Sequence, residues 1–356
     1  MSYLSIIDFL ELCHNYYSTI YTIVFPINSF LSFLWQVDKT CLTNLNECIY
    51  TLTTINCVSV AGLCLLPAKK LETYTFPNYL AGLIEGDGSI IVPDEHTKSY
   101  TPYFEIVFHI EDKYLAEIIQ LKIGGVLRFK TNYCVLVIKS KMSVLKIIHL
   151  INGNLRTPKI EALGRMINWF NLNRNCNMQI LDLDTSPLNS NSWLSGFIDA
   201  DGSFYLNWLY DKKGKPTSLQ YYMRLSQRQI YHRDSLSYYK IMSGISNFLS
   251  VPLRSRLRHR KNDYIETSFE VRSGSYISNY ILLSYLINYP LFSYKFKAIP
   301  VQVELLQLSK SRNYKLMPSG LEKLNNLKER LQYHNDSNSE NARITHLNYI
   351  LNYFPL

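Results

Sequence analysis

Two aspartates, Asp87 and Asp201, end two copies of one short sequence pattern. Residues 79–90 read YLAGLIEGDGSI and residues 193–204 read WLSGFIDADGSF, and the two align without a gap. In a single copy, an acid followed by Gly would be explained well enough as a turn. Two carboxylates brought into one locality repel each other unless a cation lies between them. Because carboxylate, carbonyl and water oxygens suit Mg²⁺, the repeated pattern predicts a divalent metal site.

The elements around these acids are predicted to be two helices in close contact. Apolar residues recur at helical spacing in both copies, at Leu80, Leu83, Ile84 and at Leu194, Phe197, Ile198. Gly82 and Gly86 share one helical face, and Gly196 and Ala200 match them in the second copy. Such a face of small residues lets two helix backbones approach closely. Each helix is expected to stop at its Asp-Gly step, with the Gly in the left-handed position that follows many helices.

Alternating residues predict antiparallel strands after each motif. Three runs present their more polar side on every second residue: Ser203, Tyr205, Asn207; Gln220, Tyr222, Arg224, Ser226; and Tyr103, Glu105, Val107, His109. The intervening positions are aromatic or aliphatic. This pattern is typical of a sheet with one face on a core and the other in water. A helix is expected from Asp112 onward.

The clearest charge pattern is LRSRLRHRK at residues 253–261. Its arginines have period two, so one strand face presents four guanidinium groups, from Arg254, Arg256, Arg258 and Arg260. Solvated charges on an edge strand are the alternative, but four cations on one face repel without an anionic partner. Phosphates and guanine edges would supply one, so contact with nucleic acid is favoured. A weaker counterpart in the first copy is Arg128, Lys130, Lys139 and Lys141.

Composition separates a basic body from a poorly charged front end. The 356 residues include 37 Lys and Arg against 28 Asp and Glu, a net charge of +9, and 47% are hydrophobic. That hydrophobic content excludes a disordered chain. The first 70 residues contain no Arg and slightly more acids than lysines, so the excess positive charge lies beyond them. A basic body favours a polyanionic partner.

The front end contains an uncharged run from Asn15 to Val37 that is long enough to span a bilayer. Pro26, Asn28 and several hydroxyl residues interrupt it, so membrane insertion and packing against the body both stay open. Neither a signal peptide nor an Arg-rich presequence fits, because the leading residues are acidic and lack Arg. The seven cysteines form no CxxC pair, which favours reduced thiols over a zinc site. No Walker, GxSxG or HExxH motif competes.

The segments LAGLIEGDG (80–88) and LSGFIDADG (194–202) resemble the two signature motifs of double-motif LAGLIDADG homing endonucleases. The resemblance covers about residues 73–310. It implies an α+β fold of two pseudo-symmetric αββαββα halves, with the motif helices at their interface and two saddle-shaped antiparallel sheets that straddle DNA. The corresponding division is a hydrophobic extension at 1–72, a first half at 73–185, and a second half with a helical tail at 186–356.

The resemblance also implies roles for single residues. Asp87 and Asp201 would bind the catalytic Mg²⁺, with the carbonyls of Gly86 and Ala200 as further ligands. RTPKIEAL (156–163) and FSYKFKAI (292–299) match the segments that carry a catalytic lysine, which nominates Lys159 and Lys295. The family's water-ordering polar residue falls on Gln227. The same alignment gives Asp112 in the first half. This departure would make the two strands cleave at different rates, unless the alignment is off by one.

A set of residues on the sheets is expected to contact nucleic acid: Asn207, Gln220, Tyr222, Arg224, Arg254, Arg256, Arg258, Arg260, Arg128, Lys130, Lys139 and His109. The implied function is a monomeric endonuclease that hydrolyses both strands of a long double-stranded DNA site and leaves short 3′ overhangs. The alternative is a maturase that binds its own group I intron RNA, alone or together with cleavage. A degenerate, merely structural copy is disfavoured because both motif acids are present.

The family is typically encoded in introns of organelle genomes and is often fused to upstream sequence. The resemblance therefore implies a mitochondrial protein, in the matrix, ahead of a chloroplast one. Residues 1–70 would then be an upstream extension or leader, either removed or retained, which makes their hydrophobic, Arg-free character intelligible. Contact between this segment and a membrane stays open.

Overall fold

The computed structural model describes residues 76–96, 99–213, 216–231, 235–259, 265–310, 318–332 and 350. The expected front end and Arg260 lie outside these residues. All the described residues belong to one compact unit. Within them, no helix combines the length and the apolar character needed to cross a bilayer.

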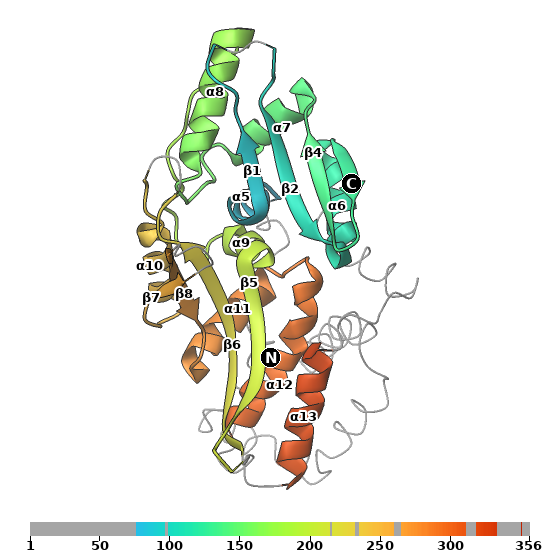
Figure 1. Ribbon diagram of the computed structural model, residues 1–356, viewed down its shortest axis with the longest axis vertical. Coiled ribbons are helices and arrows are strands. Elements are labelled where there is room, and N and C mark those ends of the chain that lie inside the picture. Colours follow the sequence, from blue (N-terminus) through green and yellow to red (C-terminus); the bar gives the residue numbers. More distant parts are fainter. Residues whose placement is uncertain are drawn as a thin grey trace, which may run out of the picture. The chain divides into compact units, whose positions relative to one another are not determined.

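The chain forms two successive runs of elements with the same order (Figure 1). The first consists of α5 (Phe76–Asp87), β1 (Gly88–Ile91), β2 (Tyr103–His109), the 3₁₀ helix η3 (Ile110–Asp112), α6 (Lys113–Ile123), β3 (Val126–Phe129), β4 (Tyr133–Ile138), α7 (Lys141–Ile151) and α8 (Ile160–Arg174). The second consists of α9 (Trp193–Asp201), β5 (Gly202–Tyr210), β6 (Pro216–Arg228), α10 (Tyr239–Phe248), β7 (Arg254–His259), β8 (Ile265–Arg272), α11 (Tyr276–Asn288), the 3₁₀ helix η5 (Tyr294–Lys297), α12 (Ala298–Lys310) and α13 (Pro318–Gln332). Both runs contain αββαββα followed by further helix, which confirms the expected α+β fold.

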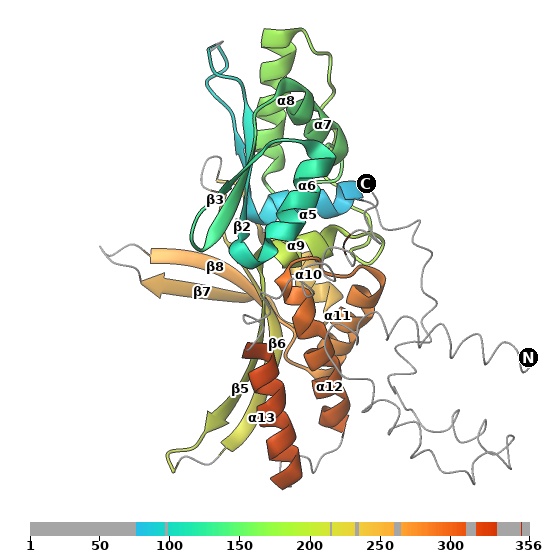
Figure 2. The same cartoon turned by 90° about the vertical axis from the view of Figure 1, so that its right-hand side faces the viewer.

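Each half has a four-stranded antiparallel sheet, with the orders β1-β2-β4-β3 and β5-β6-β8-β7. The strand registers also match, because Gly88 pairs with Ile106 as Gly202 pairs with Leu225. Figure 2 shows the helices α6, α7, α11 and α12 gathered on one side of the strands. Figure 1 looks onto the opposite side, which is the open face of both sheets.

The alternation in the sequence decides which side of each strand faces the helices. Phe104, Ile106 and Phe108 are buried, whereas Glu105 is half-buried and His109 is exposed on the open face. In the second half the buried set is Leu206, Met223, Leu225 and Val271. The predicted half-wet sheets are therefore confirmed.

The main hydrophobic core runs continuously through both halves, and the motif helices lie within it. Tyr79, Trp193 and Phe197 are among its largest fully buried side chains. A smaller cluster packs α12 and α13 against the long β5–β6 hairpin, from Leu206, Val301, Leu305, Leu324 and Leu327. The second half is thus larger than the first on the side away from the motif helices.

The prediction that a left-handed glycine follows each motif helix is wrong. Gly202 has φ −72° and ψ 149°, which is extended backbone, and Gly88 begins strand β1 without a positive φ. Close packing explains these glycines instead. A Cβ on Gly88 would lie 2.7 Å from the Ile84 carbonyl oxygen, and one on Gly202 would lie 2.6 Å from that of Ile198. The chain turns from helix into strand so tightly that only glycine fits against the preceding turn.

Candidate active site between the motif helices

The two motif helices, α5 and α9, touch through their backbones. A Cβ on Gly82 would lie 2.0 Å from the Trp193 carbonyl oxygen, and one on Gly196 would lie 2.1 Å from that of Tyr79. Figure 1 shows the two helices side by side between the sheets. The predicted face of small residues is confirmed, and it brings the C-terminal ends of both helices into one place.

Asp87 and Asp201 lie at these adjoining helix ends. A Cβ on Gly86, next to Asp87, would lie 2.9 Å from the Asp201 Oδ2 atom. Burial raises the pKa of half-buried Asp201 to about 7, and the Asp87 carboxylate adds to the rise while Lys159 and Lys295 oppose it. Partial desolvation also raises the pKa of Asp87, again opposed by the two lysines. The two acids therefore repel each other at close range, which favours a cation between them.

The donor set at the helix ends fits a hard divalent cation. Within the described residues, no third His, Cys, Asp or Glu joins the two aspartates to complete a metal-binding cluster. Mg²⁺ is commonly held in this way, by one or two carboxylates together with waters and substrate phosphates.

The two predicted lysines close the ends of the two helices in the same manner. Lys159 Nζ donates to the carbonyl oxygens of Ile84, Gly86 and Gly88, at 2.9, 3.1 and 2.7 Å. Lys295 Nζ donates to those of Ile198, Asp199 and Ala200, at 3.2, 2.5 and 2.8 Å. An ammonium group at a helix C-terminus offsets the negative end of the helix dipole. These bonds also reach Gly86 and Ala200, whose carbonyl oxygens each keep a second lone pair for another partner.

Burial lowers the pKa of Lys159, while the carboxylates of Asp201, Glu85 and Asp87 raise it. The lysine and the acids thus form one electrostatic unit in which each group favours the charged form of the other. The structure brings together five residues nominated from the sequence: Asp87, Asp201, Lys159, Lys295 and, as shown below, Gln227.

Two further acids, Glu85 and Asp199, occupy the same place in the two motifs and were given no role from the sequence. Glu85 is buried and accepts from the backbone N–H groups of Arg156 and Thr157, at 2.9 and 2.6 Å. Asp199 is buried and accepts from the Phe292 N–H at 2.7 Å and the Ser293 hydroxyl at 2.5 Å. Each acid therefore holds the segment that carries the lysine of its own half.

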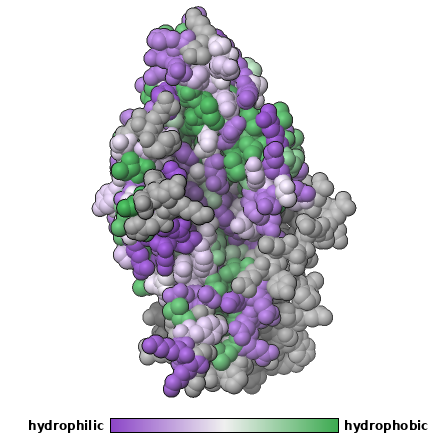
Figure 3. All heavy atoms as spheres, viewed as in Figure 1, coloured by the Kyte–Doolittle hydropathy of each residue, from purple (hydrophilic) through white to green (hydrophobic). Residues whose placement is uncertain are grey.

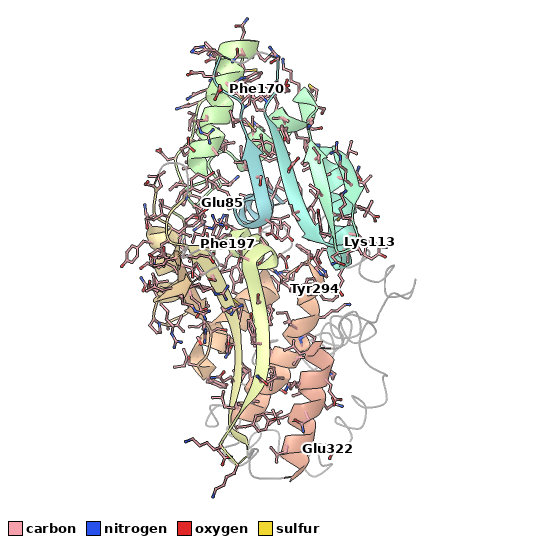
Figure 4. All side chains as sticks on the ribbon, in the orientation of Figure 1. Glu85, Lys113, Phe170, Phe197, Tyr294 and Glu322 are labelled. Atoms are coloured by element: carbon pink, nitrogen blue, oxygen red, sulfur yellow. The ribbon has the colours of Figure 1, made fainter. Side chains whose placement is uncertain are left out.

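The same two acids also tie the motif helices together across the interface. Trp193 Nε1 donates to Glu85 Oε2 at 2.5 Å, and the Tyr79 hydroxyl donates to Asp199 Oδ2 at 2.7 Å. Figure 4 labels Glu85 and Phe197 at this junction of α5 and α9. Burial raises the pKa of both acids, and their hydrogen bonds oppose the rise. The signal for them was present in the sequence, because both copies pair an aromatic residue with an acid six positions later.

Gln227 contacts the second aspartate, but the first half has no matching contact from Asp112. Gln227 Nε2 donates to Asp201 Oδ2. The matched registers place Phe108 at the position of Gln227, two residues beyond Ile106 as Gln227 is two beyond Leu225. Phe108 is buried in the core. The alignment of Asp112 with Gln227 is therefore wrong, and Asp112 instead contacts the second half, at the Tyr294 N–H.

On the second sheet, the predicted arginine face is present and extends over three strands. Arg254, Arg256 and Arg258 pair with Glu270, Ser268 and Glu266, so they share one face. Arg254 and Arg258 are exposed, whereas Arg256 forms an ion pair with fully buried Glu270 at 2.6 Å. The same carboxylate pairs with Arg272, also at 2.6 Å. The ladder is thus partly neutralised at its middle member, Arg256.

The remaining second-sheet candidates lie on the same open face. Arg224 lies over the Tyr205 ring at 4.5 Å, and that ring stacks on Tyr222 at 5.1 Å. Gln220 and Asn207 are exposed, and Lys328 of α13 donates to Asn207 Oδ1 at 3.2 Å. This face therefore combines cations, aromatic rings and amides, the groups that contact phosphates and base edges.

The first-sheet face combines cations with exposed apolar residues. Arg128 and Lys130 are exposed, and Lys139 lies over the Tyr103 ring at 4.4 Å. His109 lies at the end of β2, 3.8 Å from the Glu111 carboxylate, and Lys141 is exposed at the start of α7. Exposed apolar residues on this face include Val107, Val126 and Tyr133. Figure 3, which looks onto both sheets, shows hydrophobic patches among hydrophilic surface over the first sheet.

Comparisons with known proteins agree with this geometry. The family model described as LAGLIDADG endonuclease matches residues 80–170 and 194–301. The intron-encoded DNA endonuclease aI3 of Saccharomyces cerevisiae is 35% identical over 257 residues, which are 64% of this chain and 62% of that protein. The intron-encoded RNA maturase bI4 of the same organism is 30% identical over 151 residues, which are 41% of this chain and 21% of that protein. The chain thus spans less than two thirds of the length of either relative.

Two solved structures share the fold. The LAGLIDADG homing endonuclease I-GzeII, in complex with its DNA target, has a TM-score of 0.51 at 17% identity and covers 74% of this chain and 100% of its own. The meganuclease I-AabMI, bound to uncleaved DNA, has a TM-score of 0.51 at 20% identity and covers 71% of this chain and 98% of its own. At these identities the likeness concerns the fold alone.

Proposed function

The chain belongs to the LAGLIDADG endonuclease family, and we propose that it is a site-specific endonuclease that cuts both strands of a long double-stranded DNA target. The observation that carries this proposal is the duplicated centre at the helix ends. Each motif helix ends in an aspartate and is closed by a lysine from its own half. Two equivalent centres suit a substrate with two antiparallel strands of the same backbone chemistry.

A divalent cation, for which we propose Mg²⁺, would polarise the scissile phosphate and activate the attacking water. Asp87 and Asp201 would hold it, with the carbonyl oxygens of Gly86 and Ala200 as further donors. Lys159 and Lys295 supply fixed positive charge beside the acids, where hydrolysis of a phosphodiester builds up negative charge. Gln227 fixes the orientation of Asp201 and places its amide to orient a water there.

The open faces of the two sheets are proposed to contact the DNA. In the second half these contacts would come from Asn207, Gln220, Tyr222, Arg224, Arg254, Arg256 and Arg258, with Arg260 beyond the described residues. In the first half they would come from His109, Arg128, Lys130 and Lys139. Exposed arginines suit phosphates and guanine edges, whereas exposed valines suit thymine methyl groups.

We further propose a monomer that acts in mitochondria, with domain limits at 1–72, 73–185 and 186–356. The described residues support the monomer, because one chain contains both centres. The limit between the halves would lie in the connection between α8 and α9. The names of the related proteins, which are intron-encoded, support an organellar intron as the source.

The test is cleavage of a duplex that spans the intronless junction of the chain's own host gene. Purified protein with Mg²⁺ should break both strands, and a chelator in excess should stop the reaction. A duplex with the intron inserted at the junction is the matched control and should stay intact. Failure to cut the intronless duplex, under conditions in which the protein binds it, would contradict the proposal.

A second candidate function is assistance to splicing of the intron RNA. The match to the RNA maturase bI4 favours it, and the same basic faces could bind an RNA backbone. Splicing of the precursor RNA should then be faster with protein and should persist when Asp87 and Asp201 are replaced by Asn. Splicing that is indifferent to the protein would exclude this function.

A further inference from the structure

Asp112 belongs to the first half but contacts the lysine-bearing segment of the second. It precedes α6, is only 5% exposed, and its Oδ1 accepts from the Tyr294 N–H at 2.5 Å. The His109 ring packs on the Tyr294 ring at 5.4 Å beside this bond. Figure 4 labels Tyr294 close to Lys113, the first residue of α6. A buried carboxyl group thus connects the two halves away from the motif helices.

The bond reaches the residue immediately before Lys295. Tyr294 and Lys295 both lie in η5, a single 3₁₀ turn of four residues. In so short an element, the position of one backbone N–H largely decides where the next side chain starts. Asp199 holds the two preceding residues from within the second half, at the Phe292 N–H and the Ser293 hydroxyl. Asp112, from the other half, accepts from the next N–H group along the chain, that of Tyr294.

The first half holds its own lysine differently. Glu85 accepts from Arg156 and Thr157, as Asp199 accepts from Phe292 and Ser293. The next residue, however, is Pro158, which has no N–H and whose ring fixes φ. The proline ring therefore makes the backbone before Lys159 rigid by itself. Before Lys295, the backbone is held instead by an acceptor from another segment.

We propose that Asp112 is a positioning residue for Lys295, so that the backbone N–H immediately before the lysine of the second centre is held by a residue of the first half, where the first centre has Pro158 instead. This inference rests on the proposed function for its effect on cleavage, and on the hydrogen bond itself for its effect on the protein alone. Burial raises the pKa of Asp112 to about 8. The fold therefore keeps a hydrogen-bond acceptor at this buried position although its desolvation costs free energy.

The first test resolves cleavage by strand. Lys295→Met identifies the strand that depends on Lys295, by slowing its nick. Asp112→Ala should slow the same strand by about tenfold or more, because small displacements of a catalytic group have effects of this size, and should leave the other strand within about twofold. Asp112→Asn keeps an acceptor oxygen and should restore the ratio of strand rates. Glu111→Ala, which removes the neighbouring carboxylate, is the matched control and should not change that ratio.

A double-mutant cycle separates positioning from general damage. Tyr294→Pro copies the first half, and extended Ser293 (φ −70°, ψ 169°) is compatible with a following proline. In this background Asp112→Ala should no longer change the ratio of strand rates. An equal slowing of both strands by Asp112→Ala, or the same effect with and without Tyr294→Pro, would overturn the inference.

The second test needs neither metal nor DNA. Amide hydrogen exchange at Tyr294 should be faster in the Asp112→Ala variant than in the original chain. The exchange rates at Arg156 and Thr157 should be the same in both. Unchanged exchange at Tyr294 would overturn the inference even if cleavage were altered. If the original chain cuts no DNA, the proposed function fails, while accelerated exchange at Tyr294 still supports the hold by Asp112.

Discussion

The centre of the molecule and its two sheets differ in how closely the halves match. At the centre, Lys159 and Lys295 each bond three carbonyl oxygens, and Glu85 and Asp199 each bond one lysine segment and one aromatic residue across the interface. On the sheets, β7 presents Arg254, Arg256 and Arg258 on one face, whereas β3 of the first half has one arginine, Arg128, and its sheet face also exposes Val107 and Val126.

This difference follows from what each region would have to do. The two strands of DNA have the same backbone chemistry, so two hydrolytic centres gain nothing by diverging. The bases along a long target differ from one half-site to the other, so the faces that contact them are free to diverge. The centre therefore holds the residues for chemistry, and the sheet faces hold the residues for recognition.

The largest effect is expected at the motif acids. Asp87→Asn or Asp201→Asn removes a negatively charged ligand and should lower the cleavage rate by on the order of a thousandfold. Binding of the duplex in Ca²⁺, measured by fluorescence anisotropy, should stay within about threefold of the original value, since the sheets are untouched. Undiminished cutting by either variant would remove that acid from the metal site.

The bonds across the motif helices should have matched effects on stability. Tyr79→Phe and Trp193→Phe each remove one donor to a buried carboxyl group. Each should lower the free energy of unfolding, and for the loss of the hydrogen bond alone we expect about 1.5–3 kcal/mol. Urea unfolding of the two variants measures this, with Tyr100→Phe, an exposed tyrosine, as the control. A lower free energy of unfolding in only one of the two variants would mean that the two hydrogen bonds are not equivalent.

Particular residues show which parts of the fold and the site could be predicted from the sequence. The repeated motif and the period-two arginines predicted Asp87, Asp201 and the strand face, because their spacing alone decides which side they occupy. Glu85 and Asp199 were missed although both copies pair an aromatic residue with an acid six positions later, because their other partners, among them the N–H groups of Arg156, Thr157 and Phe292, come close only in the fold. Asp112 was misaligned because strand register depends on pairing across the sheet. A glycine needed for close approach looks the same in sequence as one needed for a positive φ.

The two sheet faces should differ in their dependence on salt. Arg254→Ala with Arg258→Ala should weaken DNA binding by about tenfold and lower the slope of log affinity against log salt by about two. Val107→Ser with Val126→Ser should weaken binding by only about threefold and leave the slope unchanged, because apolar contacts release no counterions. Anisotropy titrations at several salt concentrations measure both. Equal changes in slope would contradict the assignment of different contacts to the two faces.

A separate effect is expected in the pH dependence of stability. Asp112 has a pKa of about 8 in the fold, against 3.8 ordinarily, next to Glu111, Asp199 and Lys295. The folded state keeps a proton that the unfolded chain releases, so this group lowers stability as pH rises from about 4 to about 8.

Asp112→Asn removes that titration. The free energy of unfolding of the variant, relative to the original chain, should therefore increase from pH 5 to pH 8, by at most about 1.4 kcal/mol per pH unit. Urea unfolding at the two pH values measures it, with Glu111→Gln as the control. Parallel pH dependences in the original chain and the Asp112→Asn variant would show that the buried carboxyl group does not titrate as described.

The central claim is that each of the two centres acts on one strand, and strand-resolved cleavage tests it most directly. A duplex labelled differently on its two strands is cut by the original chain, by Lys159→Met and by Lys295→Met. Each substitution should slow one strand by about a hundredfold, and the two should slow opposite strands. Slowing of the same strand by both, or of neither strand by either, would contradict the account.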